Sequence, residues 1–280
     1  MTVEEWLIDV TEQFTRANIP TARLDAELIL CHMLGVERSW LVAHGDESLA
    51  RAALANPKGV RPGGISVYGD KLVLRRLKRE PLAYLFAKKE FYGRDFFVNK
   101  HVLIPRPETE ALIELAKKHS IRGKVIDVGC GSGTIGLTLV KELQDITLTL
   151  SDTSPDALEV AEKNAKSLRA KDIEFVRSDL LEEWLETDTR FDSIVANLPY
   201  VDRAWDRSPE TNHEPAFALF ADDGGLALIK RLVDQCEGVL ASKGYLLLEA
   251  DPEQHDEIVR YATQFKDVER LDYALLLEKL

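Results

Sequence analysis

Apolar residues recur at helical spacing through the first 50 residues, which predicts amphipathic helices there. Pro20-Thr21 interrupts the repeat, with Thr21 as a candidate N-cap, and Gly35 is a candidate C-terminal cap. The repeating apolar positions are Val3, Trp6, Leu7, Val10, Phe14, Leu24, Ala26, Leu28, Ile29, Met33 and Leu34. We therefore expect a small all-helical domain that extends over residues 1–85.

The pattern after this helical region changes from loop to helix to strand. "NPKGVRPGGIS", residues 56–66, is rich in Pro and Gly and predicts a loop, and "DKLVLRRLKRE" predicts a basic helix. In residues 82–105, aromatic and β-branched residues flank Tyr92-Gly93-Arg94-Asp95, which predicts a β-hairpin with that turn. We expect this hairpin, assigned to residues 86–104, to link two domains.

From Pro105 onward, strand and helix patterns alternate. The expected strands are "KVIDVG", "ITLTLSD", "IEFVRSD", "FDSIVANLPY", "GYLLLEA", "VERLDY" and "ALLLEKL". The expected helices are "TIGLTLVKEL", "SPDALEVAEKNAKSL", "GGLALIKRLVDQCEGVL" and "PEQHDEIVRYATQF". This alternation predicts an α/β domain over residues 105–280, with a parallel sheet covered by helices on both faces.

Composition narrows the class of protein. The 280 residues are 45% hydrophobic and 30% charged, and they include no apolar run long enough for a transmembrane helix. The acidic N-terminus lacks the pattern of a secretory signal. Cys31, Cys130 and Cys236 are too widely spaced for a disulfide framework or a zinc site. We therefore expect a cytoplasmic protein that holds no metal and spans no membrane.

Charge is distributed unevenly along the chain. Of the net charge of −12, residues 1–100 contribute +2, from 15 basic and 13 acidic side chains, and residues 101–280 contribute −14, from 21 and 35. Such an acidic half disfavours direct binding to a phosphate backbone. It suits a basic protein partner, or it simply keeps the chain soluble.

Polar and small residues follow the first three strands of the expected sheet, where open parallel sheets bind ligands. "VIDVGCGSGTIGL" places three glycines before a helix, so that backbone N–H groups can approach a ligand closely. Asp152 ends the next strand and can accept both hydroxyls of an adenosine ribose, and Ser178-Asp179 ends the third. NAD and S-adenosylmethionine both carry that ribose, and Gly131 to Gly136 also fits the dinucleotide spacing G-x-G-x-x-G, so these three strand ends leave both cofactors open.

The fourth strand end, Asn197-Leu198-Pro199-Tyr200, favours one chemistry. It offers an amide oxygen, a peptide carbonyl and an aromatic face, without a proton relay, nucleophile or metal set. These groups suit a planar NH₂ attached to a π system, in an amide or a nucleic-acid base. Two acceptors aimed at its hydrogens localise the nitrogen lone pair toward a methyl donor, while Tyr200 covers the planar group. The plain alternative is a strand-ending turn.

At these residues the chain resembles the PrmC/HemK class of protein-(glutamine-N5) methyltransferases, over almost its whole length. The resemblance rests on "REPLAYLFAKKEFYGRDFFVNKHVLIPRPETE", "DVGCGSGTIGLTL", "HEPAFALFADDGG", "GYLLLEA" and the Asn197 tetrapeptide. It implies a class I, Rossmann-like S-adenosylmethionine-dependent methyltransferase sheet with a small N-terminal all-helical domain and a β-hairpin linker. It also implies that the substrate is the glutamine of the GGQ motif in peptide-chain release factors, docked by the helical domain.

The resemblance also implies site residues. The methionine portion of S-adenosylmethionine would lie against Gly129, Cys130, Gly131, Ser132 and Gly133. Asp152 would hold the ribose, and Asp179 and Leu180 would lie beside the adenine. Asn197 would be catalytic together with Tyr200, would lie near the cofactor, and would bind substrate together with Leu198, Pro199 and Tyr200.

Three positions depart from the family pattern. Leu198 stands where the family usually has a first proline, but leucine keeps the backbone carbonyl that the chemistry needs, and Pro199 still favours an extended Leu198. Leu180 replaces a tryptophan common in well-studied members. The C-terminus, "LDYALLLEKL", lacks the usual Gly and Arg, which puts the closing strands in question.

Four other functions compete with glutamine methylation of a release factor. Methylation of a ribosomal-protein glutamine differs only in the docking surface. Methylation of an amino group on a DNA or RNA base is disfavoured by the acidic catalytic half and by the lack of a target-recognition insertion. A non-catalytic binding module and an NAD oxidoreductase fit the strand ends less well. We expect a monomer with a release factor as its protein partner.

Overall fold

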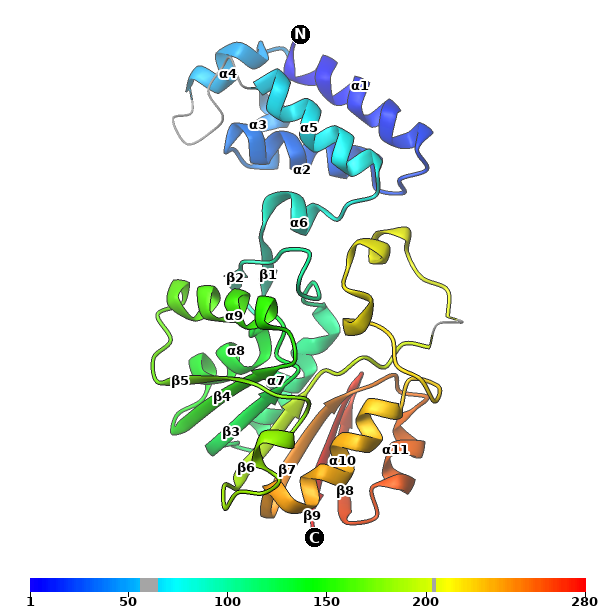
Figure 1. Cartoon of the computed structure of the whole chain (residues 1–280). Helices are drawn as coiled ribbons and strands as arrows, with labels where there is room; N and C mark the ends of the chain where they lie inside the picture. Colours follow the sequence, from blue (N-terminus) through cyan, green and yellow to red (C-terminus); the bar gives the residue numbers. More distant parts are fainter. Residues whose placement is uncertain (56–64, 203–204) are drawn as a thin grey trace. The chain divides into compact units, whose positions relative to one another are not determined.

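The computed structural model describes residues 1–55, 65–202 and 205–280 and divides into two compact units (Figure 1). The helical unit comprises Met1–Ala87 together with the short segment Ser208–His213, and the sheet unit comprises Lys88–Arg207 and Glu214–Leu280. The hairpin expected as a separate linker belongs to the sheet unit. Most of the loop expected at residues 56–66 lies outside the described residues.

In the described residues, six helices form the main body of the helical unit. Their bounds are α1 Val3–Arg16, α2 Ala22–Leu34, α3 Arg38–Ala43, α4 Leu49–Ala55, α5 Ile65–Leu77 and α6 Leu82–Phe86. A capping box between Thr2 and Glu5 starts α1, and Gly35 ends α2 in the left-handed conformation, as the sequence predicts. Thr21 occupies the N-cap position of α2, but its side chain makes no capping hydrogen bond. The apolar stripes of these helices meet in one core.

The hairpin is shorter than the sequence predicts. Residues 82–86 form helix α6, because Pro81 sets an extended N-cap and the apolar side chains that follow pack on the core of the helical unit. Only β1 (Lys89–Phe91) and β2 (Arg94–Phe96) pair as strands. Tyr92 and Gly93 make the turn, both with positive φ, so the turn is two residues long and the expected positions Arg94 and Asp95 belong to β2.

Within the part of the chain that the structure describes, the sheet unit is built on seven strands in the order β5-β4-β3-β6-β7-β9-β8. Their bounds are β3 Gly123–Val128, β4 Ile146–Asp152, β5 Ile173–Arg177, β6 Phe191–Ala196, β7 Leu240–Glu249, β8 Phe265–Leu271 and β9 Ala274–Lys279. The first five are parallel, and β9 runs antiparallel to both of its neighbours. The expected closing strands are therefore present, and the chain order reverses between β3 and β6.

Helices cover both faces of this sheet (Figure 1). Successive residues of β3 show why: Val125 faces one core and Ile126 the other, since side chains alternate along a strand. One face packs against α7 (Glu110–Lys118), α8 (Thr134–Glu142) and α9 (Pro155–Ser167). The other face packs against α10 (Ala227–Val239) and α11 (His255–Tyr261). Ser154 caps α9 with Pro155 at its first position, as predicted.

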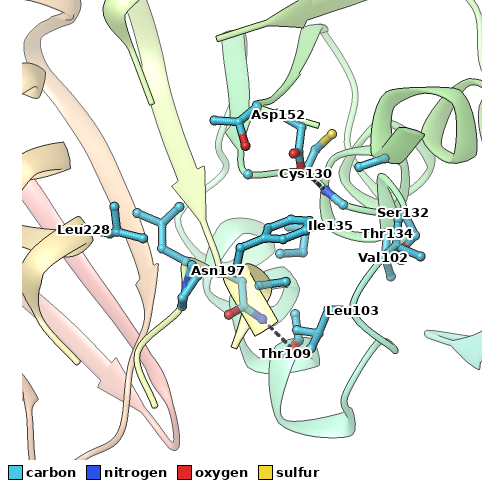
Figure 2. A pocket seen from close by; sticks show the side chains of 18 of the residues that line it. Val102, Leu103, Thr109, Cys130, Ser132, Thr134, Ile135, Asp152, Asn197 and Leu228 are labelled. Carbon is cyan, nitrogen blue, oxygen red and sulfur yellow. Dashed lines mark hydrogen bonds between the residues drawn. The ribbon is translucent and has the colours of Figure 1, made fainter. Parts of the chain in front are cut away.

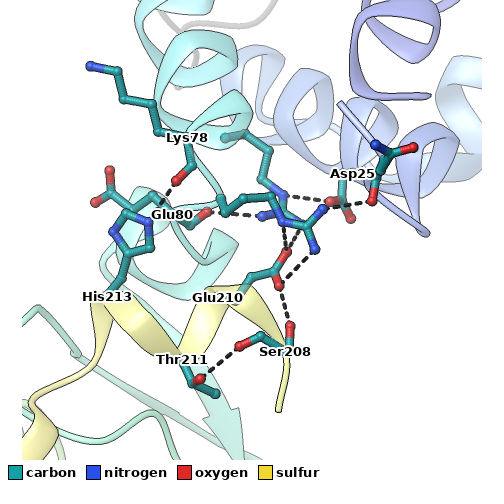
Figure 3. A network of polar contacts seen from close by, with 10 residues as sticks. Asp25, Lys78, Glu80, Ser208, Glu210, Thr211 and His213 are labelled. Atoms are coloured by element: carbon teal, nitrogen blue, oxygen red, sulfur yellow. Dashed lines mark hydrogen bonds and ion pairs between the residues drawn. The ribbon is translucent and has the colours of Figure 1, made fainter. Parts of the chain in front are cut away.

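A polar network ties the segment 208–213 into the helical unit (Figure 3). Arg76 of α5 is 4% exposed and places Nε 2.7 Å from Oδ2 of the equally buried Asp25 of α2. Its Nη2 lies 2.8 Å from Oε1 of Glu210. Arg79 also donates to Glu210, from Nη2 to Oε2 at 3.1 Å. Two arginines and two carboxylates thus hold a segment that lies about 130 residues away in sequence.

This network predicts an acid-sensitive helical unit. Burial acts to raise the pKa of Glu210, but hydrogen bonds from Ser208, Arg76 and Arg79 outweigh it and lower that pKa from 4.5 to about 2. A carboxylate whose pKa is lower in the folded chain stabilises the fold above its unfolded pKa, and that stability is lost as pH falls. We expect the free energy of unfolding to decrease between about pH 4.5 and 2 less steeply in Glu210→Gln than in the wild type, measured by denaturant titration. Equal slopes would contradict the assignment.

Within the described stretches (1–55, 65–202 and 205–280), no helix combines the length and apolar character required to cross a membrane.

Candidate active site

A cavity of about 360 Å³ opens at the carboxyl ends of β3, β4 and β6, where the order of strands reverses (Figure 2). All of the residues that line it belong to the sheet unit. Among them are Gly129, Cys130, Gly131, Ser132, Asp152, Asp179, Leu180, Asn197, Leu198 and Pro199. The structure thus brings together ten of the twelve residues that the sequence nominates. The other two, Gly133 and Tyr200, are not lining residues of this cavity.

The loop between β3 and α8 lies along one wall of the cavity. Gly129, Gly131 and Gly133 all have positive φ, which non-glycine residues rarely adopt. A Cβ on Gly131 would meet no atom within 4 Å, so at this position the backbone borders open space. Gly133 is different, because a Cβ there would lie 3.1–3.2 Å from atoms of Leu137, Ala161 and Leu150. This glycine forms the N-cap of α8 and allows the close packing of these side chains. The loop therefore presents bare backbone to a ligand.

Asp152 lies at the carboxyl end of β4 with its side chain beside this loop (Figure 2). Its Oδ2 accepts from the backbone N–H of Gly131 at 2.9 Å, and its Oδ1 accepts from that of Ser154 at 2.9 Å. Burial raises the pKa of the Asp152 carboxyl, and these backbone donors partly oppose the rise. The two hydrogen bonds fix the carboxylate at the rim of the cavity, where its remaining lone pairs can accept from ligand hydroxyls.

Asp179 and Leu180 follow β5 and line another side of the cavity. Leu180 is 6% exposed and has positive φ, so the chain turns sharply there and buries the leucine. Arg231 of α10 places Nη2 2.7 Å from Oδ2 of Asp179 and also contacts Glu182. Arg231 lines the cavity as well, and it is not among the site residues that the sequence predicts.

The tetrapeptide after β6 presents its asparagine to the cavity. Asn197 donates from Nδ2 to Oγ1 of Thr109 at 3.2 Å. Thr109 ends the short 3₁₀ turn Pro107–Thr109 within the "PRPETE" block and is itself 4% exposed. Figure 2 shows the nitrogen of the Asn197 amide turned to Thr109 and its oxygen turned away. The side-chain oxygen is therefore the group that Asn197 offers to a ligand.

Tyr200 lies apart from the other three residues of the tetrapeptide. Its hydroxyl donates to Oε1 of Glu249 at 3.1 Å, and its ring packs against the core beneath α10. Burial is the main cause of the raised pKa of this phenol, with the neighbouring Glu249 adding to it. Tyr200 is therefore not a lining residue of the cavity, and a buried carboxylate holds its hydroxyl. That its ring covers the planar group of a bound substrate stays a prediction.

The backbone of Tyr200 is held from a second direction. Nε2 of Gln254 donates to the Tyr200 carbonyl at 3.1 Å and to the Gly224 carbonyl at 2.8 Å. Gly225 packs so closely that a Cβ there would lie 2.0 Å from the Tyr200 carbonyl oxygen, and its φ is +91°. This glycine is required both by the contact and by its backbone conformation.

We therefore expect Gly225→Ala to destabilise the sheet unit and to displace the tetrapeptide. Overpacking of this kind costs about 1–3 kcal/mol, in addition to the strain of positive φ. Gly224→Ala is the matched control, because Gly224 also has positive φ but has no atom within 4 Å of an added Cβ. The free energy of unfolding, measured by denaturant titration, should fall more in Gly225→Ala than in Gly224→Ala, and equal losses would show that the contact is unimportant.

A second buried carboxylate joins two motifs that are far apart in sequence. Glu214 is 6% exposed and accepts from the backbone N–H of Ile104 at 3.0 Å and from Nη2 of Arg106 at 2.5 Å. The segment "HEPAF" is thereby attached to "LIPRPE", and residues from both segments line the cavity. Phe217 is one of these and is 59% exposed.

Comparison with known proteins decides the family. The PrmC N-terminal domain profile matches residues 5–56, and the Methyltransferase small domain profile matches residues 107–214. The release factor glutamine methyltransferase of Koribacter versatilis is 37% identical over 279 residues, covering 96% of this chain and 94% of that protein. The enzyme of the same name from Escherichia coli is 34% identical over 94% of this chain and 90% of its own. The chain belongs to the release factor glutamine methyltransferase family.

The fold of this methyltransferase agrees with a solved structure of lower identity. A methyltransferase from Pyrococcus furiosus superposes with a TM-score of 0.52 at 16% identity, over 74% of this chain and 98% of that one. The predicted class I, Rossmann-like architecture is thus confirmed. S-adenosylmethionine is the methyl donor, and the cavity fits it: bare backbone at Gly131 and a fixed carboxylate at Asp152 face the same space.

In this methyltransferase Leu198 does more than supply a carbonyl. Its side chain is 4% exposed and belongs to the core cluster under α10. A Cβ on Gly129 would lie 3.0 Å from its Cδ2, so the leucine packs directly against the glycine loop. Among the described residues, no donor reaches the Leu198 carbonyl oxygen. The backbone carbonyl of Leu198, which the sequence predicts as an acceptor, is therefore available to a ligand.

Several residues of this site carried weak signals in the sequence. Thr109, Glu249 and Gln254 hold the tetrapeptide, although they lie 49 to 88 positions from their partners in it. Thr109 and Glu249 occur inside blocks that resemble the family, "PRPETE" and "GYLLLEA", and Glu249 is a charged residue that ends an apolar strand. A carboxylate at the end of an apolar strand indicates a buried polar contact, but the sequence does not identify its partners because these depend on the fold.

Proposed function

We propose that this chain transfers a methyl group from S-adenosylmethionine to the side-chain amide nitrogen of the glutamine in the GGQ motif of a peptide-chain release factor. The observation that carries the proposal is the Asn197 amide, with its nitrogen engaged by Thr109 and its oxygen available at a cavity beside the glycine loop. Family membership supports the reaction, since the relatives are named for it.

The acceptor nitrogen defines what the site must do. The lone pair of a carboxamide nitrogen is delocalised into its carbonyl, so the nitrogen is a poor nucleophile. We assign the Asn197 side-chain oxygen and the Leu198 carbonyl as the two acceptors for its hydrogens. Both draw electron density onto the nitrogen as positive charge develops there, which is electrostatic stabilisation by groups already in place. No side chain needs to change protonation state before transfer. As the N–CH₃ bond forms, the S–CH₃ bond of the sulfonium would break to leave a neutral thioether, and the methylated nitrogen would release one proton to solvent.

The donor site is proposed from the same wall of the cavity. Backbone groups of residues 129–133 would hold the methionine portion, Asp152 would accept from the ribose hydroxyls, and Asp179 with Leu180 would border the adenine. S-adenosylmethionine supplies an electrophilic methyl group on a sulfonium. The acidic rim suits that positive charge as well as the ribose. We assign Tyr200 a role in positioning the tetrapeptide, because its hydroxyl donates to Glu249.

We further infer that the protein acts as a cytoplasmic monomer that does not bind nucleic acid directly. The net charge of −14 over residues 101–280 supports a basic protein partner over a phosphate backbone. The helical unit is the proposed docking domain for the release factor, with the match of its residues 5–56 to the PrmC N-terminal domain in support.

Leu198→Pro, which restores the usual family tetrapeptide, tests the role of this position. The carbonyl is retained, but the buried leucine side chain that packs against Gly129 is replaced by a smaller ring. We expect the turnover rate to stay within about threefold of the wild type and the sheet unit to lose about 1–2 kcal/mol of unfolding free energy. A turnover rate that falls by about two orders of magnitude or more would show that the leucine side chain itself takes part in positioning the substrate.

A methyl-transfer assay with labelled S-adenosylmethionine tests the function. Release factor, total ribosomal protein and nucleic acid are offered separately to the full-length chain. Label on the release factor alone supports the proposal. Label on ribosomal protein or on nucleic acid would replace it with one of the competing methylations, and label on none, with S-adenosylmethionine still bound, would indicate a binding module.

A further inference from the structure

Arg231 is a charged residue of the cavity wall that has no role in the methyl-transfer step. It lies three positions after Leu228 on α10, which places the two side chains on one face of the helix, and both line the cavity. The Nη2 atom of Arg231 lies 2.7 Å from Oδ2 of Asp179 and 2.8 Å from Oε1 of Glu182. These two carboxylates hold the guanidinium at a defined place beside the residues that follow β5.

The guanidinium keeps part of its hydrogen-bonding capacity for a ligand. It carries five N–H groups in one plane. Among the described residues, its hydrogen bond and its two ion pairs all start from Nη2, so Nε and Nη1 remain as donors. The contact of Asp179 with Arg231 is made by Oδ2, and Oδ1 remains as an acceptor. The cavity wall therefore carries an acceptor and a donor that are fixed relative to each other.

The edge of adenine presents the complementary pair of groups. Its 6-amino group donates, and a neighbouring ring nitrogen accepts. In hypoxanthine an oxygen acceptor replaces the amino group and N1 carries a hydrogen, although the shape of the base is unchanged. Leu180 and Leu228 also line the cavity, and their apolar side chains suit the flat faces of a purine. The polar pair is thus left for the edge of the base.

We propose that Arg231 is a specificity-determining residue for the methyl donor. Asp179 accepts from the 6-amino group of the adenine, while Arg231 holds this carboxylate in place and donates to the neighbouring ring nitrogen. A guanidinium does both at once because its N–H groups diverge within one plane, which the single ammonium of a lysine cannot do. The inference rests on the donor site of the proposed function, in which the adenine lies beside Asp179 and Leu180.

Binding of S-adenosylhomocysteine and S-inosylhomocysteine to the full-length chain, measured by calorimetry, tests the proposal. The two ligands differ only in the 6-substituent of the base and the hydrogen on N1. We expect the wild type to prefer the adenine ligand by about tenfold or more, as for other paired polar contacts to a base. Arg231→Met should lose most of this preference, chiefly because it binds the adenine ligand more weakly.

Arg270 provides the matched control in the same unit. It also pairs with two carboxylates, those of Asp256 and Asp267, at 2.7 and 2.8 Å. Its side chain is 36% exposed, against 40% for Arg231, but it is not a lining residue of the cavity. Arg270→Met should therefore keep the wild-type preference for the adenine ligand.

The outcomes separate this inference from the function beneath it. A purely structural role of Arg231 would weaken the binding of both ligands by the same factor, and that result would overturn the inference, as would a wild type that binds both equally. If Arg231→Met does not fold, judged by its thermal unfolding, Arg231→Lys takes its place, and a wild-type preference in that variant would overturn the inference. A wild type that binds no S-adenosylhomocysteine would overturn the proposed donor site as well. One that shows the expected preference but does not methylate a release factor would overturn the proposed substrate alone.

Discussion

Replacing Asn197 by alanine is expected to lower kcat for methyl transfer by about 10²–10³-fold, the usual effect of removing one preorganised polar group from a charge-stabilising site. The oxygen of this amide is the group that the structure turns away from Thr109 at the cavity. Without it, one hydrogen of the substrate amide loses its acceptor, and the nitrogen lone pair remains delocalised. The loss should fall on kcat more than on KM, because the interaction strengthens as positive charge develops on nitrogen.

The controls for this prediction separate chemistry from folding. Asn212→Ala makes the same substitution at an exposed asparagine of the segment 208–213 and should leave the rate unchanged. Binding of S-adenosylhomocysteine to Asn197→Ala, measured by calorimetry, should remain within a few-fold of the wild type. An Asn197→Ala enzyme that keeps more than about a third of the wild-type turnover rate would contradict the role assigned to this residue.

The largest effect on stability is expected from Arg76→Ala in the helical unit. Arg76 and Asp25 are both 4% exposed, and Arg76 also contacts Glu210. Removing one member of a buried ion pair leaves its partner charged and uncompensated, which costs about 3–5 kcal/mol. We expect this loss in the unfolding free energy of α2 and α5, measured by hydrogen exchange of their amides, together with faster exchange in residues 208–213.

The neighbouring arginine provides the matched control. Arg75 pairs with Glu80, but its side chain is 44% exposed, so the pair is well solvated. Such surface pairs contribute about 0–1 kcal/mol, and Arg75→Ala should therefore destabilise the helical unit only slightly. Similar losses in the two variants would mean that the burial of Arg76 is not what makes its network important.

Much of the sheet unit could be predicted because its signals are local. Strands such as β4 are short apolar runs, and Ser154 with Pro155 marks the start of α9. The predicted hairpin is longer than the observed one for the opposite reason, because contacts with distant residues decide where it begins. Residues 82–86 carry aromatic and apolar side chains that suit a strand, but packing on the core of the helical unit makes them a helix. In that case tertiary contacts outweighed local propensity.

The same division between local signals and long-range contacts applies to the site. The strand-end rule was enough to gather Gly131, Asp152 and Asn197 around one cavity, since parallel strands end at one edge. It could not place Tyr200, because the direction of its ring depends on Glu249, which lies 49 residues later. It also missed the contacts of Glu210 and Glu214, whose partners lie more than 100 residues away. Buried polar pairs follow from the fold and not from spacing.

The central claim is that the methyl group reaches a side-chain amide nitrogen of one glutamine. Tandem mass spectrometry of a release factor incubated with the full-length chain and S-adenosylmethionine tests this most directly, with the GGQ glutamine changed to glutamate as a second substrate. The account predicts one added methyl group on the side chain of that glutamine, and none on the glutamate substrate. A methyl group on any other residue, or equal methylation of the glutamate substrate, would contradict it.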